Sequence, residues 1–174
     1  MAKLRTPVGP TDHVQGAANA PITLVEYGDY QCPHCGHAYP IVKQVQQHFG
    51  ERLRFVFRNF PLREAHPWAE AAAETAEFAG AKGEFWPMHD LLFENQQRLG
   101  EALLPELGKK LRLDVAALQK ALANGEFAEH VQKDFSGGVR SGVNGTPTFF
   151  INGVRHDDDF EFATLVRAID SLRV

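Results

Sequence analysis

The only two cysteines of the chain, Cys32 and Cys35, form a single Cys-Pro-His-Cys motif. An apolar run at 22–28 precedes the motif, and a segment with helical spacing of apolar residues, 33–49, follows it. We therefore expect the motif where a strand turns into a helix. A helix N-terminus carries partial positive charge and free N–H groups, which favour a thiolate over a thiol. The pattern predicts a reactive dithiol/disulfide pair.

The spacing of the cysteines also predicts their roles. Residues three apart on a helix lie roughly 5–6 Å apart, within the reach of a disulfide. Pro33 suits the first helical position, so Cys32 is expected at the N-cap as the more exposed sulfur and Cys35 one turn further in. Cys32 is then the attacking nucleophile and Cys35 the resolving cysteine. His34 and His37 can add positive charge beside them.

Two other roles for the cysteines stay open on spacing alone. They could form an inert structural disulfide, although so small a loop gains little chain entropy. They could also bind zinc together with His34 and His37, although the spacing is crowded and the second ligand pair usually comes from elsewhere in a chain. The position of the motif after a strand favours the redox role. No cofactor and no metal are predicted.

The composition limits the class of protein. The chain has 174 residues, of which 44% are hydrophobic and 23% charged, as in ordinary globular proteins. A net charge of −4 without a Lys/Arg cluster argues against nucleic acid as a partner, and no apolar run reaches the length of a membrane span. The N-terminus shows no signal peptide. We therefore expect a cytoplasmic location, or a periplasmic or extracytoplasmic one if a leader was removed.

The remaining elements indicate how the motif is positioned. The expected strands are a short edge strand near 13–15 and the segments 22–28, 53–60, 148–151 and 154–156, and the expected helices are 33–49, 66–80, 84–97, 103–111, 114–123, 127–139 and 160–172. A crossover between strands needs only one helix, so the surplus indicates an insertion. The prediction is an α/β fold with a core of residues 12–61 plus 140–174 and a helical insertion of residues 62–139.

Two positions outside the motif are candidate site residues. Glu26 lies six residues before Cys32 in the apolar strand 22–28. If it is buried, its pKa rises and it can accept the proton of the resolving cysteine; a carboxylate that faces solvent is equally open from position alone. Thr146 and Pro147 precede a late strand, where a proline need not donate to the ladder. Composition alone favours an ordinary trans turn there.

The motif at 32–35 and the segment Gly-Thr-Pro-Thr at 145–148 together resemble the thioredoxin superfamily. Between them, Arg-Asn-Phe-Pro-Leu at 58–62 and Phe-Trp-Pro-Met-His-Asp at 85–90 are similar to its DsbA-like branch of thiol:disulfide oxidoreductases. The resemblance covers about residues 12–172. The Pro-His pair between the cysteines is more typical of that branch than of thioredoxin itself.

The resemblance implies a thioredoxin fold with a helical insertion domain and a protein-disulfide oxidoreductase that acts mainly as an oxidant. It implies catalytic Cys32 and Cys35, supporting Pro33, His34 and Glu26, and substrate-binding Thr146 and Pro147. His34 would help to stabilise the Cys32 thiolate, and Pro147 would be cis and lie against the disulfide. The implied partners are cysteine-containing proteins or peptides bound extended along Thr146, and a redox partner that recycles the enzyme.

Other functions remain open at this stage. A reductase or a disulfide isomerase can use the same fold, and its redox potential would distinguish it from an oxidant. A Cys/His metal-binding or redox-sensing module would turn over no substrate, and would bind zinc stoichiometrically if it held a metal. A glutathione-using transferase on this fold usually lacks the second cysteine, so Cys35 argues against that class.

Overall fold

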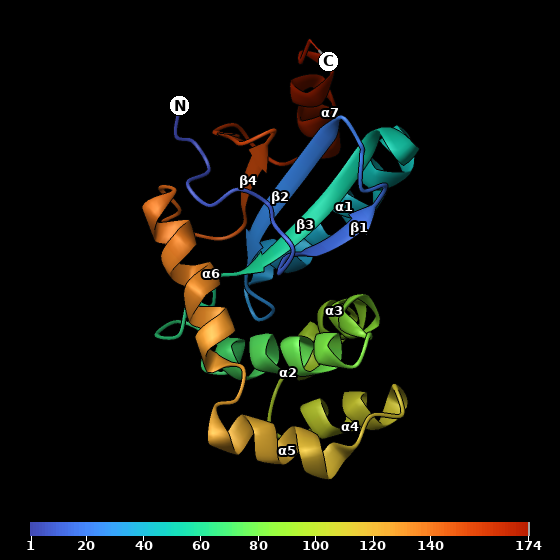
Figure 1. Ribbon diagram of the computed structural model, residues 1–174, viewed down its shortest axis with the longest axis vertical. Helices are drawn as coiled ribbons and strands as arrows, with labels where there is room; N and C mark the ends of the chain where they lie inside the picture. Colours follow the sequence, from blue (N-terminus) through green and yellow to red (C-terminus); the bar gives the residue numbers. More distant parts are fainter. Residues whose placement is uncertain (174) are drawn as a thin grey trace.

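The computed structural model describes residues 1–173 and has a five-stranded mixed sheet at its centre (Figure 1). The strands are β1 (His13–Gly16), β2 (Ile22–Gly28), β3 (Leu53–Asn59), β4 (Thr148–Ile151) and β5 (Val154–Arg155). Their order in the sheet is β1-β3-β2-β4-β5. β2 and β3 pair in parallel and the other neighbours are antiparallel. All five predicted strands are present, and no strand end shifts by more than one residue.

Seven α-helices accompany the sheet within residues 1–173. They are α1 (Pro33–Phe49), α2 (Ala69–Ala81), α3 (Phe85–Glu94), α4 (Leu103–Lys110), α5 (Val115–Asn124), α6 (Ala128–Arg140) and α7 (Phe162–Asp170). In Figure 1, α1 and α7 lie beside the sheet, α2 to α5 form a separate layer beneath it, and α6 runs along one side from that layer toward β4. No helix of residues 1–173 has the length and apolar character needed to cross a membrane.

β2 is covered on both faces, as its apolar sequence predicts. Successive side chains of a strand point to opposite faces of the sheet. Leu24 accordingly joins the main core cluster with residues of α1 and α7, while Val25 and Tyr27 join a second cluster with Phe135 of α6. A strand that is buried on both faces loses the alternation of polar and apolar residues.

The helical block shares its core with the sheet. The main cluster contains buried side chains of α2, α3 and α4, among them Ala76, Met88 and Leu104, together with Phe57 of β3. The division into 12–61 plus 140–174 and 62–139 stays a prediction. The helix expected from His66 begins later, at Ala69, because a proline at position 67 disfavours helical backbone at the residue before it.

Arg58 of β3 is buried and ties the N-terminal arm to the sheet. Its Nε and Nη2 donate to the two carboxylate oxygens of Asp12 at 2.8 and 2.9 Å. Its Nη1 donates to the backbone carbonyl of Thr6 and to the Tyr27 hydroxyl at 2.8 and 2.9 Å. The carbonyl of Pro7 accepts from Nη2 at 3.1 Å. With so many partners, this buried charge is well compensated.

Arg58→Met tests this contact, because it leaves the Asp12 carboxylate buried without its partner. We expect the free energy of unfolding to fall by about 3–5 kcal/mol, the range for breaking one side of a buried pair. Arg98→Met is the matched control, since Arg98 pairs with Glu106 at 2.7 Å in an exposed position, and it should cost less than about 1 kcal/mol. Urea unfolding measures both; equal losses would contradict a structural role for Arg58.

Candidate active site

The cysteine motif lies between β2 and the start of α1, as predicted. Cys32 is the N-cap of α1, with extended backbone (φ −69°, ψ 123°), and Pro33 occupies the first turn. The Cys32 N–H donates to the Asp29 carbonyl at 3.1 Å, and the Gly36 N–H donates to the Cys32 carbonyl at 3.0 Å. The two cysteines therefore lie at the N-cap and in the first turn of α1.

Both cysteines are free thiols and both are buried. Cys32 is 3% exposed and Cys35 fully covered, so Cys32 is the more accessible sulfur, as expected, by a small margin. The Cys32 thiol donates to the Thr146 carbonyl at 3.6 Å, and the Asp29 N–H donates to the Cys35 sulfur at 3.4 Å. Each thiol thus meets a different set of backbone groups.

The environment favours the thiolate of Cys32. A hydrogen bond from the Cys35 thiol is the largest influence; it lowers the pKa of Cys32 to about 5 despite the opposing effect of desolvation. The Thr146 side chain and the N–H groups of Cys35 and His34 act in the same direction. The Thr146 hydroxyl is buried and has no hydrogen-bond partner among residues 1–173, which leaves it free to donate to the thiolate.

The pKa values of Cys35 and Glu26 are raised, whereas that of Cys32 is lowered. Burial raises the pKa of Cys35 well above its usual range, and its hydrogen bond to Cys32 and the charge of Glu26 add to that rise. Burial also raises the pKa of Glu26 to about 8, with a further rise from the charge of Cys32. Glu26 is buried in β2, which excludes the alternative of a carboxylate that faces solvent.

The segment at Thr146 and Pro147 meets the motif across the sheet. The peptide bond between these two residues is cis, as the resemblance implies and composition alone did not predict. β4 follows directly and pairs with β2. Because β2 leads into the motif, this pairing brings the Thr146 carbonyl to Cys32, although the two residues are 114 positions apart.

The histidines near the cysteines lie at the surface. His34 is exposed, and within residues 1–173 its imidazole forms no hydrogen bond or ion pair; its backbone N–H is the group that acts on Cys32. His37 pairs with Glu161 at 3.0 Å, with both side chains exposed. In the part of the chain that the structure describes, these residues and the cysteines do not converge as metal ligands. This geometry disfavours the zinc alternative at the motif.

Asp29 supports the motif and was missed by sequence reasoning. Its Oδ1 accepts from the N–H groups of Gln31 at 2.7 Å and Cys32 at 3.2 Å. Its Oδ2 accepts from the Leu62 N–H at 2.9 Å and pairs with His66 Nδ1 at 2.8 Å. One buried carboxylate therefore holds both the cysteine loop and the start of the helical block. An Asp is typical of turns and so indicates a turn at this position. Its partners at Leu62 and His66 are distant in sequence and leave no local pattern.

Gln96 is a second supporting residue that the sequence did not indicate. It begins a short 3₁₀ turn after α3, Gln96–Arg98. Its Nε2 donates to the backbone carbonyls of Tyr30 at 2.9 Å and Cys32 at 2.8 Å. A Cβ at Gly36 would collide with the Gln96 amide oxygen, so the glycine after the motif makes room for this contact. The helical block thus reaches the cysteine loop directly.

Comparison with known proteins identifies the family. A family model described as thioredoxin matches residues 9–171. BdbD from Bacillus subtilis has a similar structure, with a TM-score of 0.81, 27% identity and coverage of 90% of each chain. DsbA2 from Pseudomonas aeruginosa gives a TM-score of 0.72 and 28% identity over 94% of this chain and 96% of that one. The predicted thioredoxin fold with a helical insertion is confirmed.

Curated proteins that match the sequence are named as Na(+)/H(+) antiporters. A Na(+)/H(+) antiporter NhaA 1 from Salinispora arenicola is 44% identical over 169 residues, which are 97% of this chain and 26% of that protein. An NhaA antiporter from Herminiimonas arsenicoxydans is 36% identical over 171 residues. The chain spans about a quarter of the length of these relatives. The name antiporter is given to those longer proteins as a whole. The chain itself belongs to the thioredoxin family, in its DsbA-like branch of thiol-disulfide oxidoreductases.

Proposed function

We propose that this oxidoreductase works as an oxidant, and that it transfers the Cys32–Cys35 disulfide to cysteine-containing proteins. The observation that carries the proposal is the opposite shift of the two thiols, with the pKa of Cys32 lowered to about 5 and that of Cys35 raised. At neutral pH, Cys32 is then a thiolate and Cys35 a thiol. Stabilising the thiolate favours the reduced pair, and a pair that favours reduction oxidises its substrates.

The exchange takes two steps. A substrate thiolate attacks the Cys32 sulfur, breaks its bond to Cys35 and forms a mixed disulfide; Cys35 leaves as a thiolate and takes up a proton. A second substrate thiolate then attacks the substrate sulfur of the mixed disulfide and releases Cys32. The substrate ends as a disulfide, and the enzyme as a Cys32 thiolate with a Cys35 thiol. The low pKa of Cys32 makes it a good leaving group in the second step.

We assign Glu26 the transfer of the Cys35 proton. At neutral pH its carboxyl is mainly protonated, because its pKa is about 8, so it can give a proton to the departing Cys35 thiolate. In the reverse direction, its carboxylate accepts the proton when Cys35 attacks a mixed disulfide. The charge of Glu26 contributes to the raised pKa of Cys35, which supports their proximity.

The substrate is proposed to lie extended along Thr146 and Pro147, with Pro33 on the other side of the sulfur. A surface groove lined by Pro33, Gly36 and residues 93–98 adjoins the motif. The Thr146 carbonyl already faces the Cys32 sulfur, so an extended backbone at the mixed disulfide would run beside it. An oxidant of protein thiols acts where disulfides persist, such as the periplasm. An oxidant role therefore favours the periplasmic or extracytoplasmic location over the cytoplasmic one, and both the location and the recycling partner stay predictions.

Cysteine variants test the proposal directly. The oxidised protein is mixed with a reduced, unfolded protein, and substrate disulfides are counted by thiol alkylation. We expect the wild type to form them and Cys32→Ala to form none. Reduced Cys35→Ala should instead accumulate a mixed disulfide with an oxidised substrate, because Cys32 can attack but nothing resolves the product. Full activity of Cys32→Ala would overturn the assignment, and a wild type that only reduces substrates would favour the reductase alternative.

Glu26→Gln tests the proton transfer, because the amide keeps the size of the side chain but cannot exchange a proton. We expect Cys35 to resolve a mixed disulfide about 100-fold more slowly at pH 8, the low end of acid-base contributions. In the wild type this rate should rise through pH 8, as the accepting carboxylate forms, and the variant should lose that rise. Single-turnover kinetics across pH 6–9 measure both.

A stability measurement accompanies the kinetics. The folded pKa of Glu26 is raised to about 8 from 4.5, so its neutral form favours folding below pH 4.5, and this contribution is lost as the pH rises to about 8. As the pH rises from 4.5 to about 8, the free energy of unfolding of Glu26→Gln should therefore increase relative to that of the wild type. Glu74→Gln is the matched control: burial raises the pKa of Glu74 in α2 to about 7, and its loss should leave the exchange rate unchanged. An unchanged pH profile in Glu26→Gln would contradict the assigned role.

A further inference from the structure

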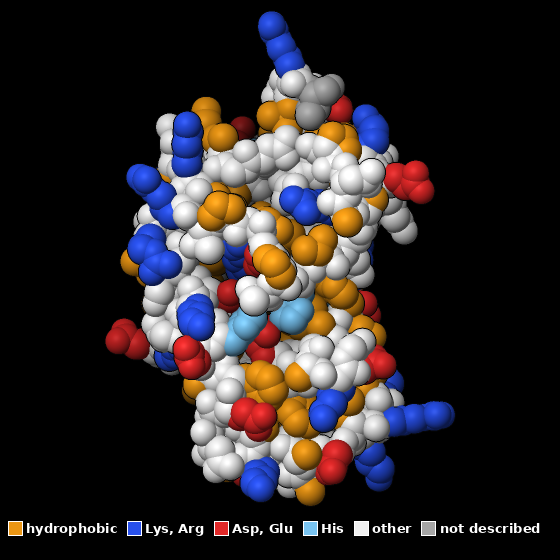
Figure 2. Space-filling model, in the orientation of Figure 1, with side chains coloured by type: hydrophobic (Ala, Val, Ile, Leu, Met, Phe, Trp, Pro, Cys, Tyr) orange, Lys and Arg blue, Asp and Glu red, His pale blue; other side chains and the backbone are white. Residues whose placement is uncertain are grey.

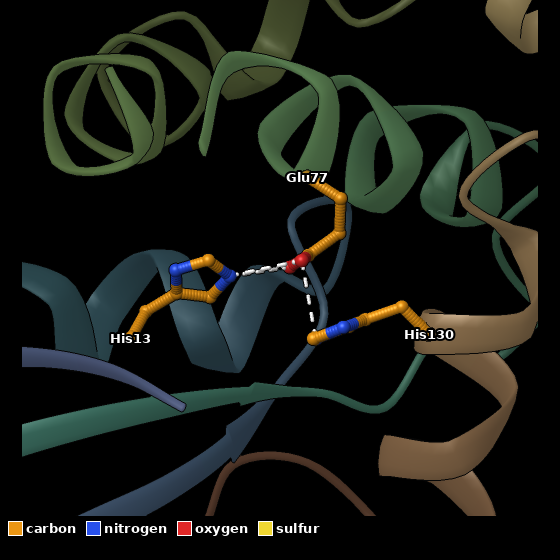
Figure 3. A group of neighbouring side chains, drawn as sticks. All are labelled: His13, Glu77 and His130. Atoms are coloured by element: carbon orange, nitrogen blue, oxygen red, sulfur yellow. Dashed lines mark hydrogen bonds and ion pairs between the residues drawn. The ribbon is translucent and has the colours of Figure 1, made fainter. Parts of the chain in front are cut away.

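Three ligand-type side chains outside the cysteine motif converge at one point (Figure 3). His13 comes from β1, Glu77 from α2 and His130 from α6. The His13 Nε2 lies 2.9 and 3.0 Å from the two carboxylate oxygens of Glu77, and the His130 Nε2 lies 3.1 Å from one of them. One ligand atom from each residue fits within 4.8 Å of the others. Figure 3 shows both imidazoles directed at the carboxylate.

The His13 ring is fixed by packing. It stacks on Phe85 with ring centroids 3.6 Å apart and an angle of 3° between the planes. A Cβ at Gly80 would lie only 3.0 Å from the His13 Cε1 and 3.4 Å from the Phe85 Cβ, so the absence of a side chain at Gly80 leaves room for the stacked pair. A ring held in this way can present its Nε2 with little loss of conformational freedom.

The carboxylate is fixed by hydrogen bonds. The Asn59 Nδ2 donates to Glu77 and to Asp134, at 3.0 Å in each case. The second of these oxygens, on Asp134, also lies 3.7 Å from the His130 Nε2. The Asn59 amide thus orients both carboxylates. Metal-binding carboxylates are commonly held by hydrogen bonds of this kind from neighbouring groups. Asp134 stands within reach as a further oxygen donor.

Two imidazole nitrogens and a carboxylate oxygen are a donor set typical of zinc. Bonds of about 2.0–2.2 Å in a tetrahedral arrangement place ligand atoms roughly 3.3–3.6 Å apart. The separations of 2.9–3.1 Å between the imidazole nitrogens and the carboxylate oxygen would need to widen by only a few tenths of an ångström. Calcium and magnesium prefer all-oxygen sites, so the two imidazoles argue against them.

The cluster is open enough for an ion to enter. Glu77 is 4% exposed, while the side chains of His13 and His130 are 19% and 31% exposed. In Figure 2, histidine side chains in pale blue reach the surface beside red acidic atoms, between the upper part of the molecule and the helical block. An ion would approach past the two rings and meet the buried carboxylate behind them.

We propose that His13, Glu77 and His130 bind a Zn²⁺ ion, with Asp134 within reach of the fourth position. The ion takes the place of the direct contacts between the two imidazole nitrogens and the carboxylate. It joins the edge strand β1 to helices α2 and α6, and so links the sheet to the helical block. It needs neither cysteine, and so is independent of the redox pair.

Calorimetric titration with zinc chloride tests the site, on the full chain without a histidine tag and with Cys32 and Cys35 oxidised so that no thiolate can bind metal. We expect one zinc per chain and a melting temperature that rises with zinc. His130→Gln should weaken zinc binding at least tenfold. His37→Gln is the matched control, because it breaks an exposed His–Glu pair of 3.0 Å that has no third ligand nearby among residues 1–173, and its zinc affinity should equal that of the wild type.

The result is interpretable even if Glu77 proves essential for folding. His130 is partly exposed, so its variant should fold, and circular dichroism of the metal-free protein verifies this. Absence of stoichiometric binding at micromolar zinc, or equal affinity in His130→Gln and the wild type, would overturn the proposal and leave a hydrogen-bonded contact between β1, α2 and α6. Calcium binding as tight as zinc binding would overturn the assignment of the ion.

Discussion

The reactivity of the site depends on the groups that converge on one sulfur atom, that of Cys32. The groups that lower its pKa come from separate elements: the Cys35 thiol and the backbone N–H groups of His34 and Cys35 from the first turn of α1, and Thr146 from the loop before β4, whose carbonyl accepts from the Cys32 thiol at 3.6 Å. They meet because the sheet order places β2, which leads into α1, directly beside β4. Asp29 and Gln96 then hold the loop that carries Cys32. The sheet therefore creates the site by bringing together segments that are distant in sequence.

The lowered pKa of Cys32 sets how strongly the reduced cysteine pair is stabilised. A pKa of about 5 for Cys32 makes its thiolate favoured over its thiol at pH 7 by about 2.7 kcal/mol. An unperturbed thiol gains nothing comparable at this pH, so the reduced pair is stabilised by about that amount. For a two-electron couple this corresponds to a potential about 60 mV less negative. Burial works against this gain, and so the donors must outweigh desolvation.

The local part of this arrangement could be predicted from the sequence, because the N-cap position of Cys32 follows from Pro33 and the strand before it. The burial of Glu26 could not be predicted from its position, which leaves a solvent-facing carboxylate equally open, and only the family resemblance favoured it. The cis bond before Pro147 required the family resemblance, because a proline at a strand entrance is compatible with either isomer. These features depend on residues close together in sequence or on a motif known from other proteins.

The long-range contacts could not be predicted. Asp29 finds its partners at Leu62 and His66, and no local pattern marks that pairing. The same holds for His13 and Glu77, 64 positions apart, which meet because an edge strand lies against a helix of the inserted block. The polar residues that support the site are therefore visible only once the sheet and the helical block are placed together.

The equilibrium redox potential of the Cys32–Cys35 pair, measured against glutathione, tests the central claim most directly. We predict a value clearly less negative than the roughly −270 mV of thioredoxin and shifted toward the roughly −120 mV of DsbA. A value at or below that of thioredoxin would show that the hydrogen bonds to Cys32 do not favour the reduced pair, and would contradict its role as an oxidant.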